Sequence, residues 1–208
     1  WQTIKWRGME KILIALFTSP IIGFVIGYIL LRLVLILSWN ATPRINELFK
    51  RSQIITAISL ALSHGANDAQ KTMGLITLAL VITGNLKTFK VPFWVILICA
   101  SMIALGTAVG GWRLIRTLGG KFYRIRPVDG FTAQLASAVV IISASIFGGP
   151  VSTTQVVSSA IMGVGAAERA NKVRWGIAQE IIVAWILTIP ATALVAAGVY
   201  WMITRLIP

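Results

Sequence analysis

This chain contains several long apolar runs. Each is long enough to cross a bilayer as an α-helix, which takes about 20 residues. Four of these runs occupy residues 12–37, 54–83, 93–112 and 175–203. They predict an all-α, polytopic transmembrane protein. We expect a single membrane domain over residues 1–208, with residues from about 12 to 203 embedded and in contact with membrane lipids.

The amino-acid composition argues against several classes of function. Hydrophobic residues make up 57% of the chain and charged residues only 12%, whereas soluble domains carry about 25% charged residues. The net charge of +13 does not predict a nucleic-acid partner, because the basic residues lie between apolar spans, where positive-inside topology places them. One His and one Cys are too few for a nucleophile–base pair or a metal cluster, so we expect neither an enzyme nor a cofactor.

The second apolar run contains a polar cluster, Gly65-Ala66-Asn67-Asp68-Ala69-Gln70-Lys71-Thr72-Met73-Gly74. A charged side chain near the bilayer centre costs about 2.5–3.5 kcal/mol on insertion scales, so such a cluster usually marks a pathway for a polar or charged solute. Asp68 can neutralise Lys71 at i,i+3 or ligate a cation, and the alternative is a polar knot that only joins helices. The flanking glycines predict an interrupted helix, whose freed amides and carbonyls would face an anion and a cation.

Two shorter apolar helices are expected at residues 131–146 and 156–167, with Phe147-Gly148-Gly149-Pro150 breaking the chain between them. Their length favours a re-entrant hairpin with its tip at membrane depth, where irregular backbone must face protein or a water-filled cavity. Ser152, Thr153 and Thr154 open the second helix and are typical of an N-cap. A cap needs one hydroxyl rather than three, which favours an anion seat formed with the helix N-terminal amides.

The sequence leaves the roles of three other polar residues open. His64 is either a packing residue or, with Asp68, half of a metal site. Gln134 and Glu180 either pair with neighbours or line the pathway. Loop charge predicts a multi-pass protein of the cell membrane whose main basic loops, including residues 40–51 and both loops that flank the hairpin, are cytoplasmic. The sparser loop with Lys87 and Lys90 then lies outside.

Two motifs resemble the signatures of the inorganic phosphate transporter family. They are Gly65-Ala66-Asn67-Asp68 with a second glycine at Gly74, and Pro150-Val151-Ser152-Thr153-Thr154 followed by residues 158–165. Residues 173–176 and 184–190 are similar to the C-terminal region of that family. Members consist of two inverted repeats, each with one Asn-Asp and one Ser-Thr-Thr motif. This chain has one of each and starts at Trp1 rather than Met, so it resembles the C-terminal half of a carrier.

The resemblance implies a secondary active transporter that moves inorganic phosphate with Na⁺ or H⁺ by alternating access. It implies that Ser152, Thr153, Thr154, Asn67 and Gln155 bind the substrate, and that Asp68, Asn67 and Thr153 bind the cation. Sodium at Asp68 is the one metal expected. Many members have His where this chain has Gln155, so no proton role is carried over to that position.

Several alternatives remain at this stage. The chain can be a sulfate permease of the same family, since sulfate is also a tetrahedral oxyanion. It can also be a passive anion channel or a non-transporting membrane subunit. The expected partners are phosphate or sulfate and a missing N-terminal repeat or a second subunit. A symmetric homodimer would need dual topology, which the charge bias of the loops disfavours.

Overall fold

The computed structural model describes residues 6–120, 125–149 and 151–206. These ranges contain only helices: α1 (Trp6–Leu37), α2 (Ile45–Ile82), α3 (Phe93–Gly120), α4 (Pro127–Ile146), α5 (Thr153–Glu168), a short 3₁₀ helix (Ala170–Lys172) and α6 (Trp175–Leu206). The all-α prediction is therefore confirmed. Pro150 of the predicted turn and Lys121 and Arg124 of the predicted basic loop lie outside the described residues.

Among the described residues, the helices long and apolar enough to cross a membrane are α1, α3, α4 and α6. The expected number of about four spans is confirmed, but the set differs from the one predicted. α4 has 20 residues, more than the short helix expected at 131–146, because it begins at Pro127. The polar cluster lowers the hydropathy of α2, which does not meet the same test.

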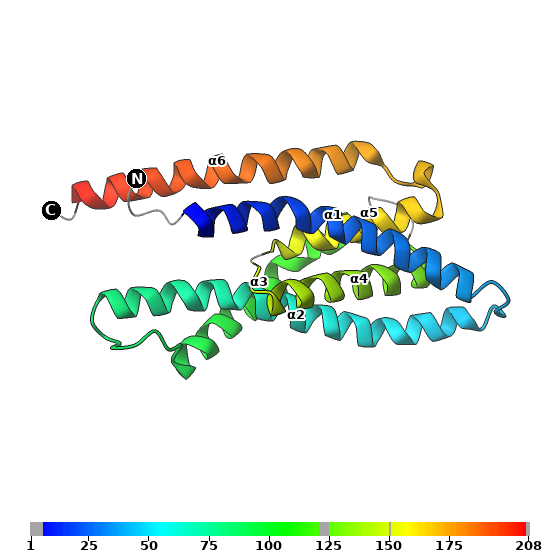
Figure 1. Ribbon diagram of the computed structural model, residues 1–208, viewed down its shortest axis with the longest axis horizontal. Helices are drawn as coiled ribbons and strands as arrows, with labels where there is room; N and C mark the ends of the chain where they lie inside the picture. The colour runs from blue at the N-terminus through cyan, green and yellow to red at the C-terminus, as the bar shows by residue number, and fades with distance from the viewer. Residues whose placement is uncertain (1–5, 121–124, 150, 207–208) are drawn as a thin grey trace. The chain divides into compact units, whose positions relative to one another are not determined.

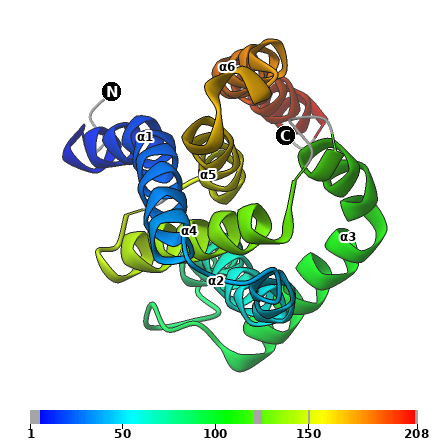
Figure 2. The ribbon, with the colours of Figure 1, turned by 90° about the vertical axis from the view of Figure 1, so that its right-hand side faces the viewer.

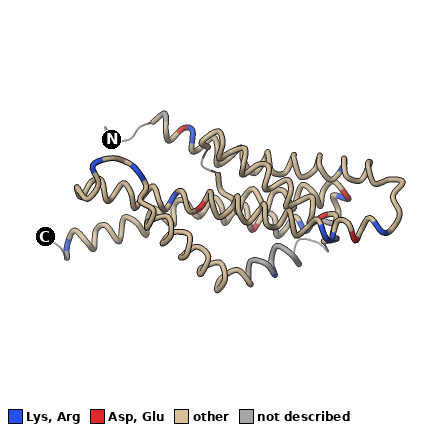
Figure 3. Tube along the Cα trace, turned by 90° about the horizontal axis from the view of Figure 1, so that it is seen from below, with Lys and Arg blue, Asp and Glu red and all other residues tan. Residues whose placement is uncertain are grey.

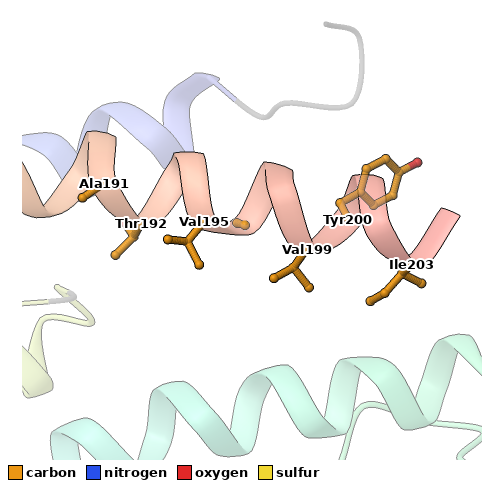
Figure 4. A pocket seen from close by; sticks show the side chains of 7 residues that line it. Ala191, Thr192, Val195, Val199, Tyr200 and Ile203 are labelled. Atoms are coloured by element: carbon orange, nitrogen blue, oxygen red, sulfur yellow. The ribbon is translucent and has the colours of Figure 1, made fainter. Parts of the chain in front are cut away.

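The chain forms two compact units, residues 1–173 and residues 174–208. The second unit is essentially α6, which contains Pro190 and is exposed along most of its length. Thr192, Val195, Val199 and Ile203 project from one side of α6 at helical spacing (Figure 4). Such an apolar face suits contact with lipid or with another helix.

In the first unit, α4 and α5 form a helical hairpin that leaves and returns to the same end of the unit (Figure 1). The predicted hairpin is therefore present. α1 packs along α5 and α4, while α2 packs against α4 and α3 (Figure 2). The tip of the hairpin lies part-way along α2. Most residues of α5 are buried, which makes this helix the centre of the unit.

The predicted interruption of the second span is wrong, because α2 continues without a break from Ile45 to Ile82. Gly65 and Gly74 both keep helical backbone and have open space where a side chain would begin. Asn67, Asp68 and Lys71 bond to one another and to the hairpin while the backbone of α2 stays helical. The break in this fold lies instead between α4 and α5.

The hairpin tip is a helix stop built on glycine. Phe147 is the C-cap of α4, and Gly148 follows with φ +66°, a left-handed conformation that glycine adopts without a Cβ clash. The Gly149 N–H donates to the Ala144 carbonyl at 2.8 Å and the Gly148 N–H to the Ser145 carbonyl at 3.2 Å. This is a Schellman motif, and it ends α4.

An ionic cluster closes the base of the hairpin. Arg126 precedes α4, and its backbone N–H and guanidinium Nε donate to Asp129 at 3.0 and 3.2 Å. The same guanidinium contacts Glu168 at the end of α5 at 2.9 Å. Asp129 is fully buried. The start of α4 is therefore held to the end of α5 by charge as well as by packing.

Small residues bring α1 and α5 into close contact. A Cβ placed on Gly27 would lie 2.6 Å from the Ala160 carbonyl oxygen, and one on Gly23 would lie 2.6 Å from the Ser159 hydroxyl. A Cβ on Gly163 would meet the Phe24 carbonyl. Membrane helices commonly pack in this way through small residues four apart. Gly163 therefore allows the close approach of α5 to α1.

Candidate functional site

The two polar motifs meet at the tip of the hairpin. Thr153, the first residue of α5, donates its hydroxyl to Asp68 Oδ2 on α2 at 3.2 Å. Asn67 Nδ2 donates to the Val151 carbonyl and to Asp68 Oδ1, both at 3.3 Å. Residues more than 80 positions apart in the chain are thus joined by side-chain hydrogen bonds.

Lys71 completes the junction. Its ammonium group donates to Asp68 Oδ1 at 3.1 Å, one turn earlier on α2, and to the Val151 carbonyl at 2.9 Å. The ion pair balances the charge of Asp68. An ammonium group has three donor hydrogens, and the bonds to Asp68 and Val151 use two of them. One N–H of Lys71 therefore stays available to a ligand.

A cavity of about 320 Å³ opens beside this junction. It is lined by Leu16, Asp68, Lys71, Val151, Ser152, Thr153 and Thr154. Ser152 is the N-cap residue of α5, but its side chain makes no capping hydrogen bond. The Ser152 hydroxyl and the first amides of α5 are therefore not occupied by one another, and the positive end of the helix dipole faces the same region.

A smaller cavity, of about 210 Å³, also has Lys71 in its lining. Its lining comes from α2 and from the other arm of the tip: Asn67, Gln70, Lys71, Ser145, Gly148 and Gly149. Lys71 lines both cavities. Gln70, which the sequence placed in the cluster, belongs to this second cavity.

His64 and Gln155 lie at different edges of the site. His64 Nε2 is 3.3 Å from Asp68 Oδ2, so histidine and carboxylate do meet. Among the residues that the structure describes, no group of three His, Cys, Asp or Glu side chains forms around them. Gln155 is buried and lines neither cavity, so its role as a substrate ligand stays a prediction.

Gln134, which the sequence left open, lies away from the site. Its Oε1 accepts a hydrogen bond of 2.7 Å from the Thr56 hydroxyl, which joins α4 to α2. Leu16 of α1 and the Val151 carbonyl are site components that the sequence did not predict. Leu16 is one apolar residue in a long apolar helix, and every residue has a carbonyl, so neither carries a signal in the sequence.

The site lies deep along α2. Asp68 is midway between Ile54 and Ile82, roughly 20 Å from each at 1.5 Å of helix rise per residue. Charged loop residues adjoin the ends of the first unit, and few charges lie between (Figure 3). The Asp68–Lys71 pair therefore lies far from the charged loops at the ends of the first unit.

The sequence of this chain is similar to those of known proteins. The family model described as "Phosphate transporter family" matches residues 37–196. The chain is 45% identical to a "Probable low-affinity inorganic phosphate transporter" of Bacillus subtilis over 99% of its own length and 62% of that protein. A protein of the same description from Mycobacterium leprae is 40% identical over 96% of this chain and 49% of its own length.

These relatives are longer than the chain, which spans about half to three fifths of their length. Among solved structures, "The sodium-dependent phosphate transporter" superimposes with a TM-score of 0.87 over 98% of this chain and 68% of the other. The two sequences are 23% identical, so this similarity supports the fold alone.

Proposed function

Because this chain belongs to the phosphate transporter family, we propose that it forms part of a cation-coupled carrier of inorganic phosphate. The substrate site is the junction between α2 and the hairpin tip. The observation that carries this proposal is the Thr153–Asp68 hydrogen bond of 3.2 Å. It brings the Asn-Asp and Ser-Thr-Thr motifs to one cavity at the middle of the apolar part of α2.

The oxyanion would occupy the larger cavity. Ser152, Thr153 and Thr154 line it with three hydroxyls at the start of α5, where backbone amides and the helix dipole favour negative charge. Lys71 lines the same cavity and has a hydrogen-bond donor left for an anion. Gln155 is not part of this proposed set because it does not line the cavity.

The coupling cation would lie at Asp68, with Asn67 and Thr153 as oxygen ligands. Asp68 and Lys71 neutralise each other in the structure, so a bound oxyanion would leave the site negatively charged. Burying uncompensated charge is costly, and a co-bound cation at the Asp68 carboxylate offsets it. This is a physical reason for symport, with Na⁺ or H⁺ as the cation.

Transport would proceed by alternating access, with the hairpin and α2 enclosing a site near the bilayer midplane. The chain would contribute one of two inverted repeats, which fits the part of its relatives' length that it covers. We propose that the main basic loops lie in the cytoplasm, as their charge favours.

The Asp68→Asn variant tests the proposal. It keeps the shape of the side chain and removes the negative charge, so cation-driven uptake of radiolabelled phosphate into proteoliposomes should fall to background while the protein stays folded. Glu47→Gln is the matched control, since it neutralises an exposed carboxylate on the same helix. Normal cation-dependent uptake by Asp68→Asn would refute the role of Asp68.

The same assay separates the alternatives. Sodium and proton gradients are imposed in turn to identify the cation. Sulfate that competes as well as phosphate would favour a sulfate permease. Uptake that only equalises phosphate across the membrane would favour a passive channel. Full uptake by both Asp68→Asn and Thr153→Ala would favour a subunit without a transport role.

A further inference from the structure

Two oxygen atoms at the junction of α2 and the hairpin each accept hydrogen bonds from the same two side chains. Lys71 Nζ donates to Asp68 Oδ1 at 3.1 Å and to the Val151 carbonyl at 2.9 Å. Asn67 Nδ2 donates to the same two oxygens, both at 3.3 Å. A carboxylate oxygen of α2 and a backbone carbonyl of the hairpin therefore lie close enough together for one ammonium group to contact both.

This pair of oxygens has the chemistry of a site for a small cation. Hard cations take carboxylate and backbone carbonyl oxygens as ligands, and membrane carriers use the carbonyls of non-helical segments in the same way. Val151 lies in such a segment, between the end of α4 and the start of α5. In this structure the positive charge between the two oxygens is that of Lys71.

Lys71 also borders space that a solute can enter. Its side chain is 46% exposed, and it lines both the larger and the smaller cavity. An ion pair that only joins two helices has no need of a cavity beside it. A shorter side chain at this position would therefore open the two oxygens to a free cation arriving through either cavity.

We infer that Lys71 is a tethered cation. Its ammonium group permanently occupies a place that a chain with a neutral residue 71 would fill with a monovalent cation from solution. Asp68 Oδ1 and the Val151 carbonyl are the oxygens of this place. The mobile cation of the proposed function is then confined to Asp68 Oδ2, the oxygen that Thr153 contacts at 3.2 Å.

A tethered charge stays with the protein when a solute leaves. Lys71 offsets the charge of Asp68, and without it a further mobile cation would be needed, because an unpaired charge is costly to bury. Each phosphate is thus moved with one mobile cation fewer than if residue 71 were neutral. This consequence for coupling rests on the proposed function. The cation place itself does not, and it is measured without phosphate.

The test shortens Lys71 and supplies a free cation instead. The unfolding temperature of purified Lys71→Ala in detergent is followed during a titration with ammonium chloride, with choline chloride keeping the ionic strength constant. Lys71→Ser repeats the test with a small polar side chain. Ammonium should stabilise both variants saturably, by about 2–4 °C or more well above the midpoint. The wild type and Lys71→Arg keep a tethered charge and should respond equally to ammonium and choline.

Gln70→Ala is the matched control. It shortens the preceding side chain of α2, which lines the smaller cavity, without removing a charge, so its ammonium response should match the wild type. Lys71→Ala and Lys71→Ser variants that are equally unstable in ammonium and choline would show a purely structural role for Lys71 and overturn the inference. An ammonium response of Gln70→Ala as large as that of Lys71→Ala would overturn it too.

Transport is measured separately, as the ratio of cation to phosphate taken up by proteoliposomes. Lys71→Ala should carry about one more monovalent cation per phosphate than the wild type, because Asp68 has lost its tethered partner. An unchanged ratio would overturn the consequence for coupling. If the wild-type protein moves no phosphate while Lys71→Ala still responds to ammonium, the proposed function fails and the tethered cation stands.

Discussion

Asp68 is the residue at which α2 and the hairpin are joined most directly. Its carboxylate accepts hydrogen bonds from Asn67, Lys71 and Thr153, and His64 lies 3.3 Å away. Hydrogen bonds to an ionised group contribute about 1.5–3 kcal/mol each, more than neutral pairs do. The geometry of the larger cavity therefore depends on this one carboxylate.

The hydroxyl of Thr153 can be tested separately from the methyl group. Thr153→Val keeps the shape and removes the donor to Asp68, so phosphate affinity should fall about tenfold or more, as the loss of a charge-assisted hydrogen bond implies. Thr153→Ser keeps the hydroxyl and should bind phosphate within a few-fold of the wild type. Calorimetric titration of the purified protein measures both. Equal affinities of the Val and Ser variants would show that the hydroxyl has no part in binding.

At the scale of single residues, the sequence predicted those parts of the site that depend on the type of side chain. The family resemblance implied that Asp68, Asn67 and Thr153 share a cation site, and Asp68 is hydrogen-bonded to both of the others. Their roles in binding stay predictions. The bond from Lys71 to the Val151 carbonyl had no signal in the sequence, since a backbone acceptor is present in every residue.

Among the elements, the hairpin was predictable and the course of α2 was not. Consecutive glycines between apolar stretches favour a turn, and Gly148 adopts the positive φ that this turn needs. The glycines at 65 and 74 look similar in the sequence, yet they stay helical. A polar cluster favours a helix break only where its groups lack partners. In α2 those partners are in the hairpin, about 80 residues away.

The contact between α1 and α5 gives a prediction about stability. Gly163→Ala would place a Cβ against the Phe24 carbonyl, so one helix must shift, at a cost of about 1–3 kcal/mol. The unfolding temperature in detergent should fall accordingly. Gly106→Ala in α3 is the control, because nothing lies within 4 Å of a Cβ at that position. Its stability should stay the same or rise by up to about 1 kcal/mol from helix propensity. Equal unfolding temperatures for the two variants would contradict the close packing of α1 and α5.

The base of the hairpin gives a second prediction. Asp129 is fully buried and accepts three hydrogen bonds from Arg126, so Asp129→Asn loses the charge and one acceptor. We expect a loss of about 1–3 kcal/mol in the free energy of unfolding, measured by denaturation in detergent. Glu47→Gln, at an exposed ion pair, should change it by less than about 1 kcal/mol. A loss at Glu47 as large as that at Asp129 would mean that burial does not decide the effect.

At the scale of the whole molecule, the family resemblance seen in the sequence is confirmed by the family model over residues 37–196. The motifs were sufficient for this because two of them occur in the family's order. The sequence also predicted a single membrane domain. The structure divides after Val173 into two compact units, and the single domain stays a prediction. Sidedness also stays a prediction, since loop charge is its only support.

Sidedness is testable with single cysteines. Asn46 and Asn85 lie at opposite ends of α2, and both are exposed. In a Cys99→Ser background, a membrane-impermeant maleimide added to intact cells should label Asn85→Cys at once. It should label Asn46→Cys only after permeabilisation, because positive loops favour the cytoplasm. The opposite labelling pattern would reverse the proposed orientation.

The helices that line the larger cavity, α1, α2 and α5, contact one another in different ways. α1 and α5 interlock backbone to backbone through Gly23, Gly27 and Gly163, whereas α2 contacts α5 only slightly, and the bonds across that gap come mostly from polar side chains. Interlocked backbones resist separation, while side-chain hydrogen bonds can exchange partners with water or a ligand. We therefore expect α1 and α5 to travel as one rigid piece, and the seam that parts to admit or release a solute to run along α2.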